Sequence, residues 1–175
     1  MKSKLNHSII LFLMIIFIFT VKILGQETND KKSFGLSVSI QEAQYDIMLP
    51  ICVSNSFVVA PAIGLASVSE GGTDIGLGIV TRFYLNNKTV RPFLGGRVGI
   101  LVYNPSSDGY YELSSTHDYI IGILAGGEYF MNEGFSIGVE AQLNASVSDE
   151  NSSRFGNPGG VNINTGSAVF ATVYF

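Results

Sequence analysis

The chain of 175 residues is long enough for one domain with its own core and too short to suggest two. Its formal net charge of −4 argues against nucleic acid as a partner. The single cysteine, Cys52, excludes an internal disulfide, and one cysteine with His117 leaves only carboxylates for a metal site in the mature part. We therefore expect no metal and no cofactor.

The first 25 residues have the pattern of a secretory signal peptide. Lys2 and Lys4 precede the apolar run "IILFLMIIFIFTV", and the small residue Gly25 comes just before Gln26. The run is short for a membrane-spanning helix, which takes about 20 residues, so a retained anchor is the weaker alternative. The pattern predicts cleavage near Gly25 and a mature domain of residues 26–175. Cleavage removes three lysines and no acidic residue, which makes the mature part more acidic.

Apolar and polar residues alternate along almost all of the mature part, which is typical of β-strands with two different faces. No segment has the apolar spacing of an amphipathic helix. Tight turns rich in Asn and Gly alternate with long polar loops, which predicts hairpins whose short turns share one end. The pattern predicts eight strands, at 33–42, 45–53, 57–69, 73–85, 89–103, 117–131, 134–148 and 165–175.

Each strand places its charges on the face opposite to its apolar side chains. The apolar faces line a cavity in a soluble, lipocalin-like barrel, whereas they meet lipid in a transmembrane barrel. The polar faces are rich in Gly, Ser and Arg but poor in Lys, which favours the transmembrane barrel. Aromatic residues near the short turns favour it too, as a membrane-interface girdle; they are Phe57, Phe83, Tyr129, Phe135 and Phe175. The predicted interior polar network, with paired charges, is Arg82, Arg91, Arg97, Glu128, Glu140 and Gln142.

Two segments resemble the outer-membrane β-barrel family that includes the OmpX and OmpA-type barrels. The segments are "RFYLNNKTVRPFLGGRVGI" and "AGGEYFMNEGFSIGVEAQL", and the match includes Gly127–Tyr129 and Ser136–Glu140. The chain also ends in Phe175 after alternating apolar residues, which is similar to the signal read by the barrel-assembly machinery. The resemblance implies an all-β, eight-stranded antiparallel up-and-down barrel in a bacterial outer membrane. It implies no single function.

Candidate chemistry is sparse. A lipid-hydrolysing triad would need His117 together with Ser114 or Ser115 and Asp118, but neighbours on an extended chain face opposite sides. No catalytic residue is therefore predicted. The long loops expose Tyr110, Tyr111, Arg154 and Phe155, which are candidates for recognition of a partner surface. The alternative for these loop residues is packing over the mouth of the barrel.

The sequence thus predicts a monomeric, non-enzymatic barrel with a structural role or a role in surface interaction through its loops. Its expected partners are outer-membrane lipid and, through Phe175, the barrel-assembly machinery. The alternatives are a small pore or a lipid-modifying enzyme on the same barrel. A soluble lipocalin-like carrier is the third alternative.

Overall fold

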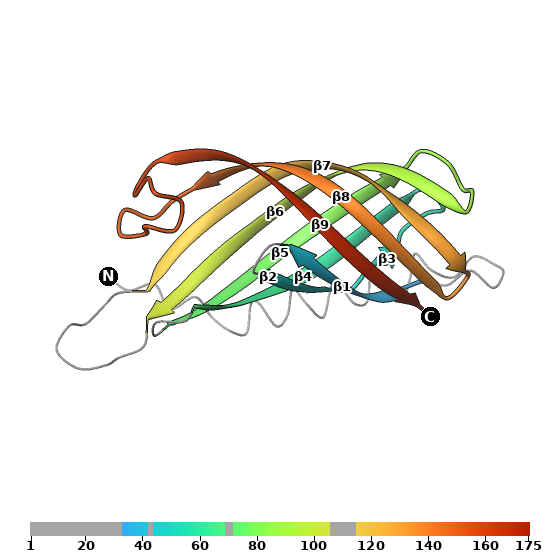
Figure 1. Ribbon diagram of the computed structural model, residues 1–175, viewed down its shortest axis with the longest axis horizontal. Coiled ribbons are helices and arrows are strands. Elements are labelled where there is room, and N and C mark those ends of the chain that lie inside the picture. Colours follow the sequence, from blue (N-terminus) through green and yellow to red (C-terminus); the bar gives the residue numbers. More distant parts are fainter. Residues whose placement is uncertain (1–32, 42–43, 69–71, 106–114) are drawn as a thin grey trace. The chain divides into compact units, whose positions relative to one another are not determined.

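The computed structural model describes residues 33–41, 44–68, 72–105 and 115–175, so the expected signal peptide lies outside the described residues. These residues form one sheet of antiparallel strands (Figure 1). The strands are β1 (Gly35–Gln41), β2 (Gln44–Met48), β3 (Ile51–Cys52), β4 (Phe57–Val68), β5 (Gly72–Tyr84), β6 (Val90–Pro105), β7 (Thr116–Asn132), β8 (Phe135–Val147) and β9 (Val161–Tyr174).

The sheet closes on itself. Its order runs from β2 through β1 and β9 back to β4 and β3, and β2 also pairs with β4. Because β2 and β3 both pair with β4, they are two parts of one strand, so the barrel has eight strands. The predicted fold class is therefore confirmed. Within the described residues, no helix is long and apolar enough to cross a membrane.

The apolar face of each long strand points out of the barrel. Along β8 the even-numbered residues are buried, whereas the odd-numbered ones are mostly exposed. This follows from the period of two, because a closed eight-stranded barrel is only wide enough for one set of side chains. The predicted direction of the faces is confirmed. Exposed apolar side chains on five different strands include Ile63, Leu77, Val98, Ile123 and Val139.

The second predicted strand is not continuous, contrary to the expectation for 45–53. Leu49 and Pro50 separate β2 from β3. Proline has no N–H to donate, so the ladder is interrupted where Pro50 lies. The carbonyl of Pro50 still accepts a hydrogen bond from the Gly35 N–H at 2.8 Å, and the Leu49 N–H donates to the Pro61 carbonyl at 2.9 Å.

The last strand begins four residues before the predicted start at 165. Val161 pairs with Val147, and the ladder continues to Phe135 opposite Val173. Residues 161–164, which were predicted to belong to the loop at 149–164, are therefore the first residues of β9. Asn162 and Asn164 look like loop residues in the sequence, but they alternate with outward apolar residues. The connection between β1 and β2 is as short as predicted, because only residues 42–43 separate the two strands.

Candidate functional site: the barrel interior and its loop end

A buried ion pair crosses the middle of the interior. Arg82 of β5 donates to Glu140 of β8 at 3.0 Å, and the side chain of each is almost fully buried. The Arg82 guanidinium carbon lies 3.8 Å from the ring centroid of Phe170 and 5.1 Å from that of Phe93. The cation is thus held by a carboxylate and by two aromatic faces. Phe93 and Phe170 share the inward face with the predicted polar residues, a feature that the sequence reasoning missed.

Arg97 of β6 lies nearer the loop end. Its Nη1 donates to the Gln142 side-chain oxygen at 2.5 Å and to the Gln41 side-chain oxygen at 3.3 Å. Gln142 in turn donates to Glu140 at 2.7 Å. The structure therefore links Arg82, Glu140, Gln142 and Arg97 in one chain of hydrogen bonds.

Glu128 forms a separate cluster nearer the short turns. It is fully buried, and its partners are hydroxyl groups of Tyr84, Ser136 and Tyr174, of which Tyr174 donates at 2.8 Å. Arg91 lies opposite Glu128 in the ladder but does not pair with it. Instead its guanidinium carbon lies 3.9 Å from the ring centroid of Phe130. Three hydroxyl donors on one carboxylate replace the expected arginine partner.

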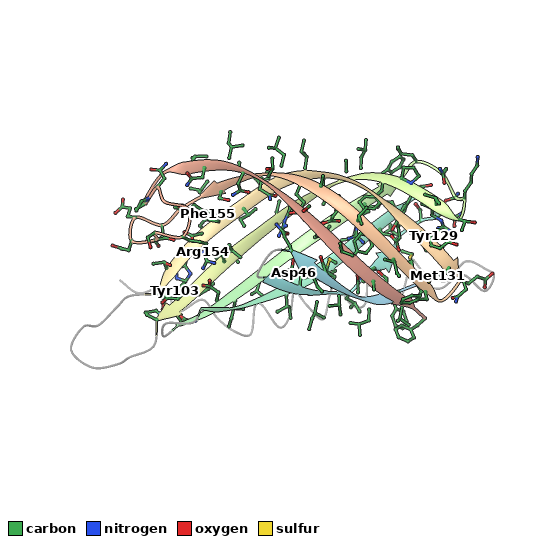
Figure 2. All side chains as sticks on the ribbon, viewed as in Figure 1. Asp46, Tyr103, Tyr129, Met131, Arg154 and Phe155 are labelled. Carbon is green, nitrogen blue, oxygen red and sulfur yellow. The ribbon has the colours of Figure 1, made fainter. Side chains whose placement is uncertain are left out.

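The loop between β8 and β9 reaches into the mouth of the barrel through Arg154. Arg154 binds Asp74 of β5 with both terminal nitrogens, at 2.8 and 2.5 Å, and donates through Nε to Asp118 of β7 at 2.9 Å. Ser152 also donates to Asp118, at 2.8 Å. In Figure 2, Arg154 and Tyr103 are labelled at this end of the barrel, while Tyr129 and Met131 are labelled at the other end. We call Arg154, Asp74 and Asp118 the loop latch.

The backbone of the same loop is tightly folded. Gly156 and Gly159 have positive φ angles of 71° and 68°, which favour glycine. Asp149 accepts a hydrogen bond from the Asn151 N–H at 2.9 Å and one from the His117 N–H at 3.4 Å. The hydrogen bond from Asn151 is the main cause that lowers the pKa of the Asp149 carboxyl from its ordinary value. The loop between β8 and β9 is thus held in a defined conformation by its own hydrogen bonds.

Of the four loop residues predicted to recognise a partner, the structure describes only Arg154 and Phe155. Tyr110 and Tyr111 lie outside the described residues. Phe155 is half-buried beside the loop latch, and the guanidinium of Arg154 is engaged by two carboxylates. The loop around Arg154 therefore packs over the mouth, which is the alternative that the sequence left open.

The residues of the hydrolytic alternative do not assemble. The side chain of His117 is exposed, while that of Asp118 is fully buried in the loop latch. Ser115 donates to Asn104 at 2.8 Å, and Ser114 lies outside the described residues. Across the part of the chain that the structure describes, no three potential metal ligands gather.

The fold is that of the eight-stranded outer-membrane β-barrels. The N-terminal β-barrel domain of Pseudomonas aeruginosa OprF is similar, with a TM-score of 0.56, 13% identity and coverage of 81% of this chain and 95% of that one. Neisserial surface protein A is similar as well, with a TM-score of 0.56, 14% identity and coverage of 81% and 93%. No protein-family model and no curated protein matches the sequence.

Proposed function

We propose that this protein is a monomeric bacterial outer-membrane barrel with no enzymatic activity. Its role is structural or lies in surface interaction through the loop end. The observation that carries this proposal is the filled cross-section at Arg82, where β5 and β8 are tied together between two aromatic rings. Such a barrel has no continuous water-filled channel, because its interior is only wide enough for side chains.

The outer surface supports residence in a membrane. Large apolar side chains are exposed around the barrel, and tyrosines lie near both ends of β7 at Tyr119 and Tyr129. An apolar band between two aromatic girdles is typical of outer-membrane barrels. A soluble carrier would need an apolar cavity, but the interior holds Asp118, Glu128 and Glu140.

Single-channel recording in planar bilayers tests the closed interior. We expect no unitary conductance from the wild-type barrel, and we expect the Arg82→Ser/Phe170→Ala variant to conduct because it removes the side chains that fill the middle. The Arg91→Gln variant is the control, since Arg91 lies against Phe130 outside this layer. Regular conductance steps from the wild type would favour the small pore instead. Release of fatty acid from phospholipid vesicles would favour the lipid-modifying enzyme.

The loop end is the surface that we propose for interaction. The loop latch fixes residues 148–160 over the mouth, which lowers the entropy cost of presenting that loop to a partner. Labelling of intact cells with a membrane-impermeant thiol reagent tests this orientation. We expect labelling of a Ser153→Cys variant in a Cys52→Ser background and no labelling of an Asn87→Cys variant at a short turn. The reverse result would place the loop end in the periplasm.

We propose further that Phe175 is read by the barrel-assembly machinery. Its side chain is exposed and lies against Phe34, with 5.5 Å between ring centroids. We expect Phe175→Ala to lower the amount of heat-modifiable barrel in outer-membrane fractions several-fold. The control is Phe34→Ala, which removes the same ring contact and leaves the C-terminal residue intact. An equal loss in both variants would show that only the ring contact matters.

A further inference from the structure

A groove runs along the outer wall of the barrel, across the five strands from β5 to β9. It has a volume of about 520 Å³, and all the residues that line it are described. Two rows of outward residues form its sides, and each row follows the strand pairing. One side consists of Ile79, Val98, Ile121, Ala145 and Ile163, and the other of Thr81, Gly96, Ile123 and Leu143. We call this feature the wall groove.

Small residues make the wall groove deep. Gly96 has no side chain and Ala145 has only a methyl group, whereas Ile121 and Ile123 beside them are large and exposed. The floor between the two rows is backbone, because the residues that supply it occupy inward positions. These residues are Arg97, Gly122 and Asn144.

The sides of the wall groove offer no free polar group to a ligand. Thr81 is the one polar side chain among them, and its hydroxyl donates to the Gly96 carbonyl and accepts from the Gly96 N–H, both at 3.2 Å. The other residues of the two rows are aliphatic or glycine. An occupant is therefore held by apolar contact, as a hydrocarbon is.

The length of the wall groove matches one leaflet of a bilayer. Five strands at a spacing of about 4.8 Å give a length of roughly 19 Å. Strands of outer-membrane barrels tilt by about 35–45°, so a row perpendicular to them descends by roughly 11–13 Å along the barrel axis. Half of a hydrocarbon core about 30 Å thick is close to that depth.

The two ends of the wall groove lie at different depths. Ile163 is near the start of β9 at the loop end, whereas Ile79 is near the middle of β5. The next row towards the loop end contains Tyr119, which is 57% exposed. Tyrosines of this kind lie at the membrane interface. The wall groove thus begins just below the interface on the loop side and descends towards the middle of the membrane.

We propose that the wall groove binds one saturated acyl chain of a membrane lipid in the leaflet on the loop side. No register shift interrupts the strand pairing along either row, so the groove runs without a step. An extended saturated chain follows this course over its full length, whereas the kink of a cis double bond turns a chain out of it. This inference rests on the proposed residence in the membrane and names a lipid contact within it.

Two glycine variants test the wall groove. Gly96→Leu fills it, and the side chain has room because the atoms nearest to an added Cβ lie 3.5 and 3.7 Å away. Gly127→Leu is the matched control. Gly127 is an outward glycine of β7 outside the groove, and nothing lies within 4 Å of a Cβ added there. The heat-modifiable shift checks the folding of each variant.

Native mass spectrometry measures the lipid that each protein retains. The barrels are reconstituted in vesicles of dipalmitoyl- and dioleoylphosphatidylglycerol in equal parts and are then extracted with a mild detergent. We expect the wild type and Gly127→Leu to retain one lipid per barrel, enriched several-fold in the dipalmitoyl form. Gly96→Leu is expected to lose most of it. Equal retention by the two variants, or no preference between the two lipids, overturns the proposal.

Tryptophan reporters locate the retained lipid, because the chain contains no tryptophan of its own. Leu143→Trp lies beside the wall groove, and Val139→Trp faces outward on the same strand but outside it. Each protein is held in mixed micelles whose phospholipid carries bromine on its acyl chains and is then diluted into excess unbrominated lipid in a stopped-flow instrument. We expect fluorescence to recover several-fold more slowly at position 143 than at position 139. Equal recovery overturns the proposal.

The outcomes separate the wall groove from residence in the membrane. In brominated vesicles, quenching at position 139 without slow recovery at position 143 overturns the acyl-chain site and leaves residence in the membrane intact. Absence of quenching at both positions contradicts residence in the membrane. A dimer in native mass spectra that Gly96→Leu abolishes and Gly127→Leu keeps would assign the wall groove to a second copy of the chain, which also overturns the proposal.

Discussion

At the scale of single residues, the interior depends on charges that are buried with their partners. Arg82 is 1% exposed, and two of its nitrogens have no hydrogen-bond partner. The carboxylate of Glu140 and the faces of Phe93 and Phe170 are what compensate its burial. Removing one member of such a pair leaves a buried charge, which costs more than removing both.

This reasoning gives a first prediction. We expect Glu140→Gln to lower the free energy of unfolding by about 3–5 kcal/mol, because it leaves the Arg82 cation without a counter-charge. The double variant Arg82→Met/Glu140→Gln is expected to regain most of that loss. Urea unfolding in lipid vesicles measures both. A double variant less stable than the single one would mean that the aromatic rings, and not the carboxylate, hold Arg82 in place.

The loop latch gives a second prediction at the same scale. Arg154→Gln leaves Asp118 fully buried without its cation, and we expect a loss of about 3 kcal/mol, at the low end for buried pairs because Arg154 is partly exposed. The Arg154→Lys variant is expected to have a stability between those of the wild type and Arg154→Gln, since one ammonium group cannot bind two carboxylates in the same geometry. Protease cleavage within residues 148–160 should become faster in the same order. Unchanged cleavage would show that the loop backbone alone fixes the cap.

At the scale of the strands, the period of two decides which side chains meet lipid. Val139 lies near the middle of β8 and points outward, whereas Val161 points outward at the loop-end start of β9. We expect Val139→Arg to cost about 2–4 kcal/mol and Val161→Arg about 0–1 kcal/mol, because the cost of a charge falls from the bilayer midplane towards the interface. Unfolding in vesicles measures the difference. Equal losses of unfolding free energy in the two variants would contradict the placement of the middle of β8 at the bilayer midplane.

The same period explains what the sequence could predict about the strands. Long alternating segments such as 134–148 correctly predicted the strand and its outward face. The predicted ends lie within one residue of the ends of β8. Prediction failed where the inward residue resembled a loop residue, as at Asn162 and Asn164, because an inward asparagine and a loop asparagine have the same local pattern. It also failed at Pro50, where the period continues across a break in hydrogen bonding.

At the scale of the whole molecule, the contacts that make the candidate site come from distant parts of the chain. Arg154 and Asp74 are 80 positions apart, and Arg97 meets Gln41 across 56. No local pattern marks such pairs, so the sequence predicted that the interior charges are paired but not which arginine meets which glutamate. The sequence reasoning also missed the inward position of Phe93. This aromatic residue shares its face of β6 with polar residues and glycines, so it does not fit the simple pattern of apolar side chains outside and polar side chains inside.

The short β1–β2 hairpin also has a consequence for how the barrel opens. The ladder between β1 and β9 joins the first and last strands of the barrel through 6 residue pairs, and β2 pairs with β4 through 4. By contrast, β4 to β9 are joined in succession by 12 to 14 pairs each. Local unfolding begins where the fewest hydrogen bonds must break together. We expect amide protons of residues 35–48 to exchange faster than those of β7 and β8, as measured by hydrogen exchange in detergent micelles. Uniform exchange would mean that the barrel opens as one cooperative unit, with no weaker seam where its two ends join.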